Sequence, residues 1–175
     1  LAIAEKCNVE IDFDTLHLPH FPIPEGYIDD VDYLADLTLK GIQKRYPNIT
    51  DEVWDRVAYE LSVIQSMGLA SYFLICWDII KFAKSQGILT GPGRGSSAGS
   101  IVCYALGVTK VDPLEYGLIF ERFINPERIA LADVDLDLAS WGRDALINYT
   151  REKYGEEFVA QIVTFTRIKA RTAVR

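Results

Sequence analysis

Cysteine, histidine and methionine are scarce in this sequence of 175 residues, which contains three Cys, two His and one Met. Cys7, Cys76 and Cys103 form no CxxC pair and have no His pair nearby, so the sequence predicts neither a disulfide framework nor a zinc site. His17 and His20 lie three residues apart. Without further His or Cys partners, we interpret them as loop residues rather than metal ligands. The expected compartment is a reducing one.

Long hydrophobic runs are missing as well. No segment approaches the roughly eighteen apolar residues of a membrane-spanning helix, so we expect no membrane partner. The first residues have neither an initiator Met nor the layout of a signal peptide, and the last ones stop inside a basic helical pattern. We therefore expect a segment of a longer chain. With 49% hydrophobic and 25% charged residues, the composition suits a globular domain and excludes a disordered, collagen-like or coiled-coil chain.

Basic charge is in deficit, because the formal net charge is −7. Taken alone, this value argues against nucleic-acid binding, since proteins that neutralise phosphates usually carry a basic surface. The charges are uneven, however: residues 151–175 carry +3 and the rest of the chain carries −10. The acidic total therefore does not exclude DNA as a partner, because carboxylates that hold metals and basic contacts to DNA can lie in different parts of one chain.

The pattern of apolar residues predicts a mixed domain of the α+β class. Residues 8–30 contain three Pro and one Gly and predict an extended connector. Short strands are predicted at residues 88–90, 129–138 and 158–164. The spacing of apolar residues predicts helices over residues 31–45, 51–67, 71–86, 96–106 and 143–154, followed by a basic helix from Arg167. Thr50 is a predicted cap, and Gly68, Gly87 and Gly107 are predicted to end helices.

A glycine-rich loop, residues 91–100 with the sequence GPGRGSSAGS, lies between a predicted strand and a predicted helix. Glycines allow the backbone to approach a ligand closely, and the start of the helix offers unpaired N–H groups. Ser96 and Ser97 add hydroxyl groups and Arg94 adds a fixed charge. The loop therefore predicts a phosphate site. No Lys precedes the Ser pair, which excludes a P-loop, whereas residues 93–98 satisfy GxGxxG/A and leave a dinucleotide-binding domain as an alternative.

A segment of alternating acidic and apolar residues follows at residues 132–138, with the sequence ADVDLDL. In a strand, Asp133, Asp135 and Asp137 project from one face, where like charges repel unless cations hold them. Carboxylate oxygens are the ligands that Mg²⁺ prefers, so this face is either a metal site or a solvated acidic edge. Arg122 and Arg128, which lie between the two motifs, are candidates for neutralising phosphate charge, or for ordinary surface ion pairs.

Together, a phosphate-binding turn and an Asp-x-Asp strand are typical of a nucleotidyltransferase palm. The residues also resemble those of a known family, the α subunits of bacterial DNA polymerase III, which are the C-family replicative polymerases. The similarity extends over the whole chain. It is carried by residues 91–100, then by YALG at 104–107, FERF at 120–123, NPER at 125–128 and DVD at 133–135.

This resemblance implies specific roles. Gly95, Ser96 and Arg122 match the family's contacts to the incoming triphosphate. Asp133 and Asp135 match the aspartates that bind two catalytic Mg²⁺ ions, for which Mn²⁺ can substitute, whereas Asp137 matches a third acidic position of lower rank. The resemblance also implies contacts to primer–template DNA. We expect these contacts to begin at the basic C-terminal helix, through residues Arg167, Lys169 and Arg171.

The resemblance further implies a fold and a domain order. The expected fold is a polymerase β-like palm with a small mixed sheet and flanking helices, incomplete in this chain. Residues 1–30 would be a connector after a PHP domain, residues 31–165 the first palm segment, and residues 166–175 the start of a thumb-side helix. The expected partners are dNTP, DNA, the sliding clamp and other replisome subunits, in the bacterial cytoplasm at the nucleoid.

The sequence departs from the family pattern at Ala132, where the family has Pro, at Leu138, where it has Phe, and over residues 139–143. The family's third catalytic aspartate lies in a second palm segment beyond this chain. We therefore expect the chain alone to bind metal and dNTP weakly and not to polymerise. Three alternatives remain: another nucleotidyltransferase of the polymerase β-like class, in which the gap between the two motifs is usually shorter, a dinucleotide-binding domain, and a non-catalytic interaction module.

Overall fold

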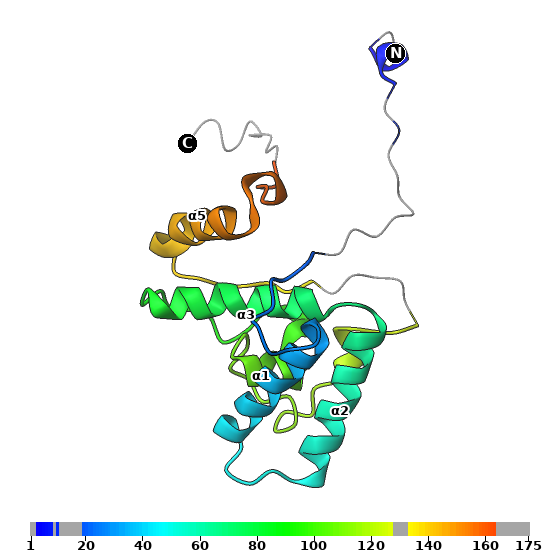
Figure 1. The fold of residues 1–175 in the computed structure, drawn as a ribbon, viewed down its shortest axis with the longest axis vertical. Coiled ribbons are helices and arrows are strands. Elements are labelled where there is room, and N and C mark those ends of the chain that lie inside the picture. Colours follow the sequence, from blue (N-terminus) through cyan, green and yellow to red (C-terminus); the bar gives the residue numbers. More distant parts are fainter. Residues whose placement is uncertain (1–2, 9, 11–18, 128–132, 164–175) are drawn as a thin grey trace, which may run out of the picture.

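The computed structural model describes residues 3–8, 10, 19–127 and 133–163, and the chain described there is helical (Figure 1). The α-helices are α1 (Asp30–Arg45), α2 (Asp51–Ser66), α3 (Ala70–Ser85), α4 (Ile101–Leu106) and α5 (Arg143–Tyr154). Short 3-10 helices lie between and beside them: η1 (Ala4–Lys6), η2 (Gly95–Gly99), η3 (Phe120–Arg122), η4 (Ser140–Gly142) and η5 (Glu156–Phe158).

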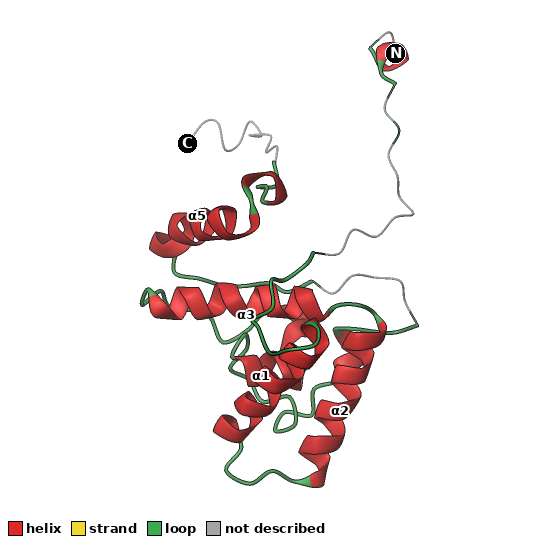
Figure 2. Ribbon diagram, in the orientation of Figure 1, coloured by secondary structure: helices red, strands yellow, loops and turns green. Residues whose placement is uncertain are grey.

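The predicted α+β fold with a small mixed sheet is wrong for this part of the chain. Figure 2 shows helices and loops but no strand in the parts described, and the β-pairing there amounts to a single antiparallel bridge between Thr90 and Leu138. Phe158, expected to begin a strand, instead ends η5. The physical reason is that an extended segment becomes a strand only when a neighbour satisfies its N–H and C=O groups, and apart from that bridge the described residues supply no such ladder.

The helices follow local signals that the sequence carries. Helix α1 begins where the Asp29 side chain accepts a hydrogen bond from the Asp32 N–H at 2.8 Å. Thr50 occupies the predicted cap position before α2, in an extended conformation, but its side chain makes no capping hydrogen bond. Gly68, which follows α2, has a φ of +66°, a left-handed conformation that favours glycine at a helix end. The predicted bounds of these helices are therefore correct within one or two residues.

The core lies where α1, α3 and α4 meet. Its largest fully buried side chains include Leu34 of α1, Phe73 and Leu74 of α3, and Phe120 of η3. Gly41 of α1 packs directly on the backbone of α4, since a Cβ added to it would lie 2.2 Å from the Ala105 carbonyl oxygen. A larger residue at that position would force the two helices apart.

Helix α5 lies against α3, on the opposite side of α3 from α1 (Figure 1). The carboxylate of Asp78 on α3 accepts hydrogen bonds from the hydroxyls of Tyr149 and Tyr154 at 2.8 and 2.9 Å, and from Lys153 Nζ at 2.6 Å. The ring of Tyr149 also stacks on Phe82, with centroids 3.8 Å apart. The nearly buried carboxylate of Asp78 therefore fastens α5 to α3, because three side chains of α5 donate to it.

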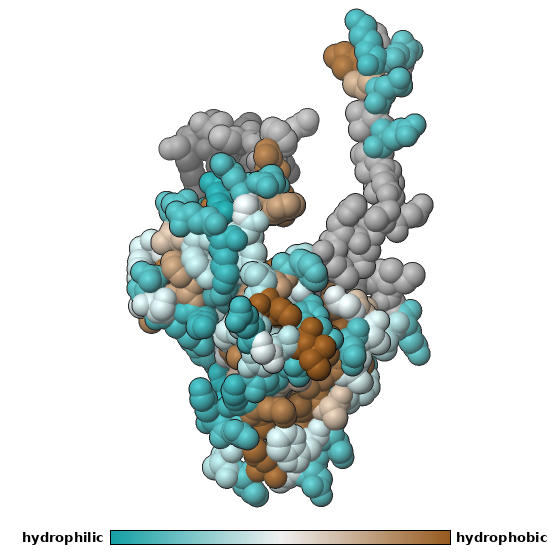
Figure 3. Space-filling model, viewed as in Figure 1, coloured by the Kyte–Doolittle hydropathy of each residue, from teal (hydrophilic) through white to brown (hydrophobic). Residues whose placement is uncertain are grey.

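Among the residues that the structure describes, no single helix is long and apolar enough to cross a membrane. The α2–α3 pair meets the length and composition criteria only jointly, and it is bent by 113° at its junction. Apolar side chains reach the surface at several places among the charged ones (Figure 3). The large ones with more than 60% of their surface exposed include Leu89, Trp141 and Phe158.

Candidate nucleotide and metal site

A cavity of about 650 Å³ lies between η2 and the segment that leads into η3. Its lining residues are Gly95, Ser96, Ala98 and Gly99 on one wall, and Gly117, Leu118, Ile119 and Arg122 on the other. The cavity therefore brings together Gly95, Ser96 and Arg122, the three residues for which the sequence predicts triphosphate contacts. A smaller cavity, of about 300 Å³, is lined by residues of α5 and η5 and contains none of the predicted site residues.

Two glycines shape the first wall of this cavity. Gly95 has a φ of +64°, a left-handed conformation that residues with a side chain rarely adopt. Gly99 lies so close to the second wall that an added Cβ would be 2.8 Å from the Ile119 carbonyl oxygen. The glycine-rich sequence is thus needed both for the turn and for the close approach of the two walls.

The helix predicted over residues 96–106, whose start was expected to bind an anion, is interrupted in the structure. Residues 96–106 are not one helix: η2 ends at Gly99, and α4 begins only at Ile101 after the cap residue Ser100. The N–H groups of Ile101 and Val102 donate to the carboxylate of Glu60 at 3.0 and 3.2 Å. Because a carboxylate from α2 already satisfies them, the first N–H groups of α4 are not available to a phosphate.

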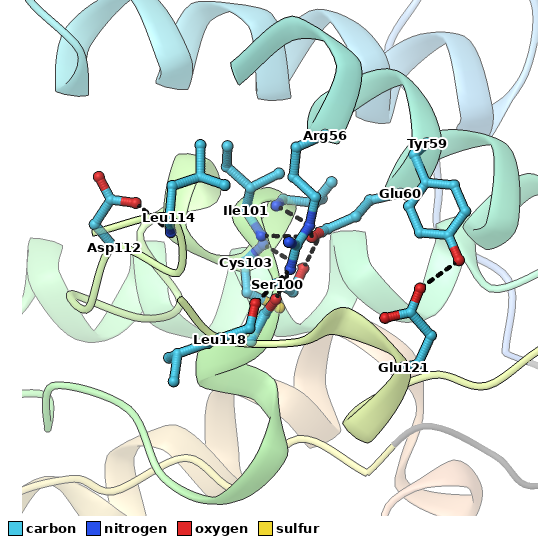
Figure 4. A network of polar contacts seen from close by, with 12 residues as sticks. Arg56, Tyr59, Glu60, Ser100, Ile101, Cys103, Asp112, Leu114, Leu118 and Glu121 are labelled. Atoms are coloured by element: carbon cyan, nitrogen blue, oxygen red, sulfur yellow. Dashed lines mark hydrogen bonds and ion pairs between the residues drawn. The ribbon is translucent and has the colours of Figure 1, made fainter. Parts of the chain in front are cut away.

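Glu60 is the centre of a buried polar network (Figure 4). Its side chain is fully buried, and it accepts hydrogen bonds from the Ser100 hydroxyl at 2.7 Å and from Arg56 Nε at 2.7 Å, besides the two N–H groups of α4. Burial raises the pKa of Glu60, while the bonds from Ile101, Arg56 and Ser100 act in the opposite direction. The four donors offset part of the cost of removing the carboxylate from water.

Arg56 and Tyr59 extend this network to the second wall. The Nη2 atom of Arg56 donates to the carbonyl oxygens of Gly99 at 2.6 Å and Leu118 at 3.0 Å, which lie on opposite walls of the cavity. The Tyr59 hydroxyl donates to Glu121 at 2.6 Å, and this bond lowers the pKa of the Glu121 carboxyl. The neighbour of Glu121 in sequence is Arg122, which is exposed and lines the cavity.

The acidic segment has the predicted alternation without being a strand. Asp133, Asp135 and Asp137 are exposed, whereas the alternating residues Val134 and Leu136 are half-buried and pack against the core. The segment is held by three backbone contacts. The Val134 N–H donates to the Tyr72 hydroxyl at 2.9 Å, the Gly91 N–H to the Asp137 carbonyl at 2.8 Å and the Ala139 N–H to the Leu89 carbonyl at 3.0 Å.

The acidic segment passes directly beside the glycine-rich loop. A Cβ built on Gly95 would lie 3.3 Å from Asp135 Oδ2, so Asp135 is adjacent to the glycine-rich turn. Arg94 is paired with Asp137, with Nη2 and Oδ1 3.1 Å apart. Two features of the prediction therefore change: the charge of Arg94 is directed at a carboxylate, and Asp137 has a basic partner within this chain.

The predictions for Arg128 and for the DNA-contacting residues Arg167, Lys169 and Arg171 lie outside the described residues. Sequence reasoning missed Arg56, Glu60 and Tyr72. A signal for Glu60 was present, because it continues the apolar stripe of Val53, Val57 and Ile64, and a carboxylate on a buried helix face requires a partner. Arg56 lies four residues earlier on the same helix, the spacing that brings two side chains together.

Comparison with known proteins identifies what this chain resembles. A family model described as the bacterial DNA polymerase III alpha NTPase domain matches residues 32–175. The DNA polymerase III subunit alpha of Borreliella burgdorferi is 52% identical over 174 residues, and that of Bacillus subtilis is 46% identical over 173 residues. These alignments cover 99% of the chain but 15% of each relative, so the chain spans about one seventh of the length of these proteins.

Proposed function

This chain belongs to the bacterial DNA polymerase III alpha family, and on that premise we propose that it supplies the triphosphate-binding surface and two metal-binding carboxylates of a template-directed DNA polymerase. The observation that carries the proposal is one juxtaposition. The cavity that unites Gly95, Ser96 and Arg122 lies beside the segment that bears Asp135. A phosphate-binding surface next to exposed carboxylates is what nucleotidyl transfer requires.

The cavity suits the phosphates of a dNTP. Gly95 and Ser96 offer backbone and hydroxyl groups on an exposed turn, and Arg122 supplies positive charge from the opposite wall. Guanidinium groups bind phosphate oxygens through paired hydrogen bonds, so Arg122 is the residue that would hold the triphosphate between the walls. Arg94 has a different role in this proposal, because its ion pair with Asp137 fastens the acidic segment to the loop.

The chemistry of the donor set fits a hard divalent cation. Asp133 and Asp135 are exposed and lie on one side of the acidic segment, and carboxylate oxygens suit Mg²⁺ and Mn²⁺. Within the described residues no group of three or more acidic, His or Cys side chains gathers closely enough to hold a metal ion. Mg²⁺ is commonly held by one or two carboxylates together with substrate phosphates, so Asp133 and Asp135 are the ligands that this chain would contribute, beside a further aspartate from elsewhere in the protein. When bound, such ions activate a 3′-hydroxyl and neutralise the departing pyrophosphate.

For the whole protein, we propose primer–template DNA and dNTP as substrates, and the sliding clamp and other replisome subunits as partners. Arg167, Lys169 and Arg171 remain the proposed first contacts to DNA. We also retain the proposed domain order, with residues 1–30 as a connector, residues 31–165 as a palm segment and residues 166–175 as the start of the thumb side.

The test uses the full-length subunit that carries this chain. Asp133→Asn and Asp135→Asn should each lower the rate of primer extension by about 100-fold or more, because each removes a proposed metal ligand, while binding of primer–template DNA is retained. Asp55→Asn, an exposed carboxylate of α2, is the matched control and should change neither quantity. Full extension activity in either variant would contradict the metal assignment.

The isolated 175-residue chain gives a second test. We expect it to bind Mn²⁺ at millimolar concentrations, seen as paramagnetic broadening of the NMR signals of Asp133 and Asp135, and not to extend a primer. Signals that stay sharp would refute the metal site. Primer extension by the chain alone would refute the proposal that the site needs a further aspartate from elsewhere in the protein.

A further inference from the structure

We propose that Arg56 and Glu60 of α2 are positioning residues that set the distance between the two walls of the triphosphate cavity. Neither residue has a proposed contact with the nucleotide, and neither was suggested by the sequence motifs. The inference rests on the proposed function of the cavity, and it adds two residues on a separate helix to that site.

Glu60 fixes the first wall. Its four donors are the Arg56 guanidinium, the Ser100 hydroxyl and the N–H groups of Ile101 and Val102. Three of these donors belong to the residues that directly follow η2, the 3-10 helix that carries Gly95 and Ser96. The C-terminal end of the phosphate-binding turn is therefore bound to one carboxylate that has no exposed surface.

Arg56 connects this wall to the second one. One nitrogen, Nη2, bonds to the carbonyl of Gly99 on the first wall and to the carbonyl of Leu118 on the second. The guanidinium is planar, so the Nε bond to Glu60 and the two Nη2 bonds fix each other's directions. A shift of Leu118 relative to Gly99 would break at least one of these bonds, and Arg122 follows Leu118 by only four residues.

The charge of Arg56 is directed inward and not at the substrate. Its side chain is 19% exposed and is paired with a carboxylate that is 0% exposed. Arg122, in contrast, is exposed at the cavity. Arg122 therefore faces the phosphates, and Arg56 holds the walls on which Arg122 and Gly95 lie.

Tyr59 adds a third connection from the same helix. Its hydroxyl holds Glu121, the residue before Arg122, at 2.6 Å, and its ring packs edge-on against Phe120 with centroids 6.0 Å apart. One turn of α2 thus contacts both walls: Glu60 and Arg56 reach the first, and Arg56 and Tyr59 reach the second. Figure 4 shows the three side chains extending from this turn toward the two walls.

Steady-state primer extension by the full-length subunit tests the inference. Glu60→Gln and Arg56→Lys should each raise the KM for dNTP by about tenfold, while kcat at saturating dNTP changes by less than about threefold, because the walls are misplaced but no reacting group is removed. Tyr59→Phe, which removes one exposed hydrogen bond and keeps the ring, should raise the KM by about twofold. Glu52→Gln, an exposed carboxylate on the same helix, is the control and should leave the KM unchanged.

The melting temperature of each variant is measured in parallel, because a merely structural role would lower it without changing the KM of the folded fraction. A lower melting temperature with an unchanged KM in Arg56→Lys and Glu60→Gln would overturn the inference. If Glu60→Gln does not fold, Arg56→Lys and Tyr59→Phe decide the question by the same criterion.

Arg122→Gln separates this inference from the proposed function. If Arg122→Gln leaves the KM for dNTP unchanged, the cavity does not bind dNTP, and the proposed function fails. If Arg122→Gln raises the KM but the Arg56 and Glu60 variants do not, only the role of Arg56 and Glu60 is refuted.

Discussion

The hydroxyl of Tyr72 meets the acidic segment midway between the two proposed metal ligands. It accepts a hydrogen bond from the N–H of Val134, the residue between Asp133 and Asp135, at 2.9 Å. Burial raises the pKa of Tyr72, so the hydroxyl remains neutral at physiological pH and adds no further negative charge beside the two aspartates. Tyr72 therefore links the acidic segment to α3 at Val134, the residue between Asp133 and Asp135.

Tyr72→Phe should loosen this segment while keeping the fold. The substitution keeps the ring and removes the acceptor of the Val134 N–H, a loss of about 0.5–1.5 kcal/mol in the free energy of unfolding. Amide hydrogen exchange measures the effect directly, and we expect faster exchange at Val134 with little change in the core of α3. Tyr116→Phe is the control, because Tyr116 is 65% exposed. Equal exchange rates at Val134 in the two variants would show that the hydroxyl does not hold the segment.

The residues that line the candidate site could be predicted from the sequence, but the long-range hydrogen bonds behind them could not. The sequence points to Gly95, Ser96 and Arg122, because glycine, serine and arginine near one another are typical of phosphate binding, and the structure brings these three to one cavity. For Glu60, the sequence shows a carboxylate on a buried helix face with Arg56 four residues earlier, but its other three donors follow about forty residues later in the chain. Local patterns do not show which distant N–H groups a carboxylate will meet, so the link from Glu60 to the glycine-rich loop is visible only in the fold.

At the level of elements, the sequence predicts helices well and strands badly. Helices α1, α2, α3 and α5 satisfy their own N–H and C=O groups and carry their end signals within the chain, so their predicted bounds are correct within one or two residues. A strand depends on a partner. The segment before Leu138 has the alternation of a strand, yet it forms a single bridge with Thr90 among the described residues. Alternation therefore predicted which side chains are exposed, but not the sheet.

Asp78 provides a test of how α5 is attached. Asp78→Asn should lower the free energy of unfolding by about 1.5–3 kcal/mol, because an amide replaces a nearly buried carboxylate that accepts from Lys153, Tyr149 and Tyr154. Chemical denaturation of the 175-residue chain measures this change. Hydrogen exchange should show lost protection in α5, with the contacts of α1 and α4 retained.

Asp55→Asn on α2 is the control for Asp78→Asn. It makes the same change of side chain at an exposed position, and it should alter stability by less than about 0.5 kcal/mol. If Asp78→Asn melts the whole chain in one step, with α1 and α5 losing protection together, the view of α5 as a separately fastened element is wrong. If stability does not change at all, the three hydrogen bonds contribute nothing net.

For the molecule as a whole, the described chain is held by polar anchors in addition to its apolar core. Tyr46 of the segment after α1 donates to Asp112 at 2.6 Å, and Tyr154 donates to Asp78 at 2.9 Å. Burial is the main cause that raises the pKa of both tyrosines, and the neighbouring carboxylate raises it further, because a phenolate there would lose its bond and face a like charge. Tyr72, the third anchor, is shifted in the same direction.

These shifts predict that the chain loses stability in alkali. A group whose pKa is raised by folding contributes stability below its unfolded pKa, here 10.0 for tyrosine, and that contribution disappears as the pH rises above this value. Above pH 10.0, the last part of the tyrosinate absorbance should therefore appear together with the loss of the far-ultraviolet circular dichroism signal, because Tyr46, Tyr72 and Tyr154 ionise only as the helices unfold. Replacing all three by Phe should make the helical signal persist to higher pH, at the cost of lower stability at neutral pH. Full ionisation of all nine tyrosines with the helical signal intact would contradict the proposed anchors, since it would require phenolates to be tolerated beside Asp78 and Asp112.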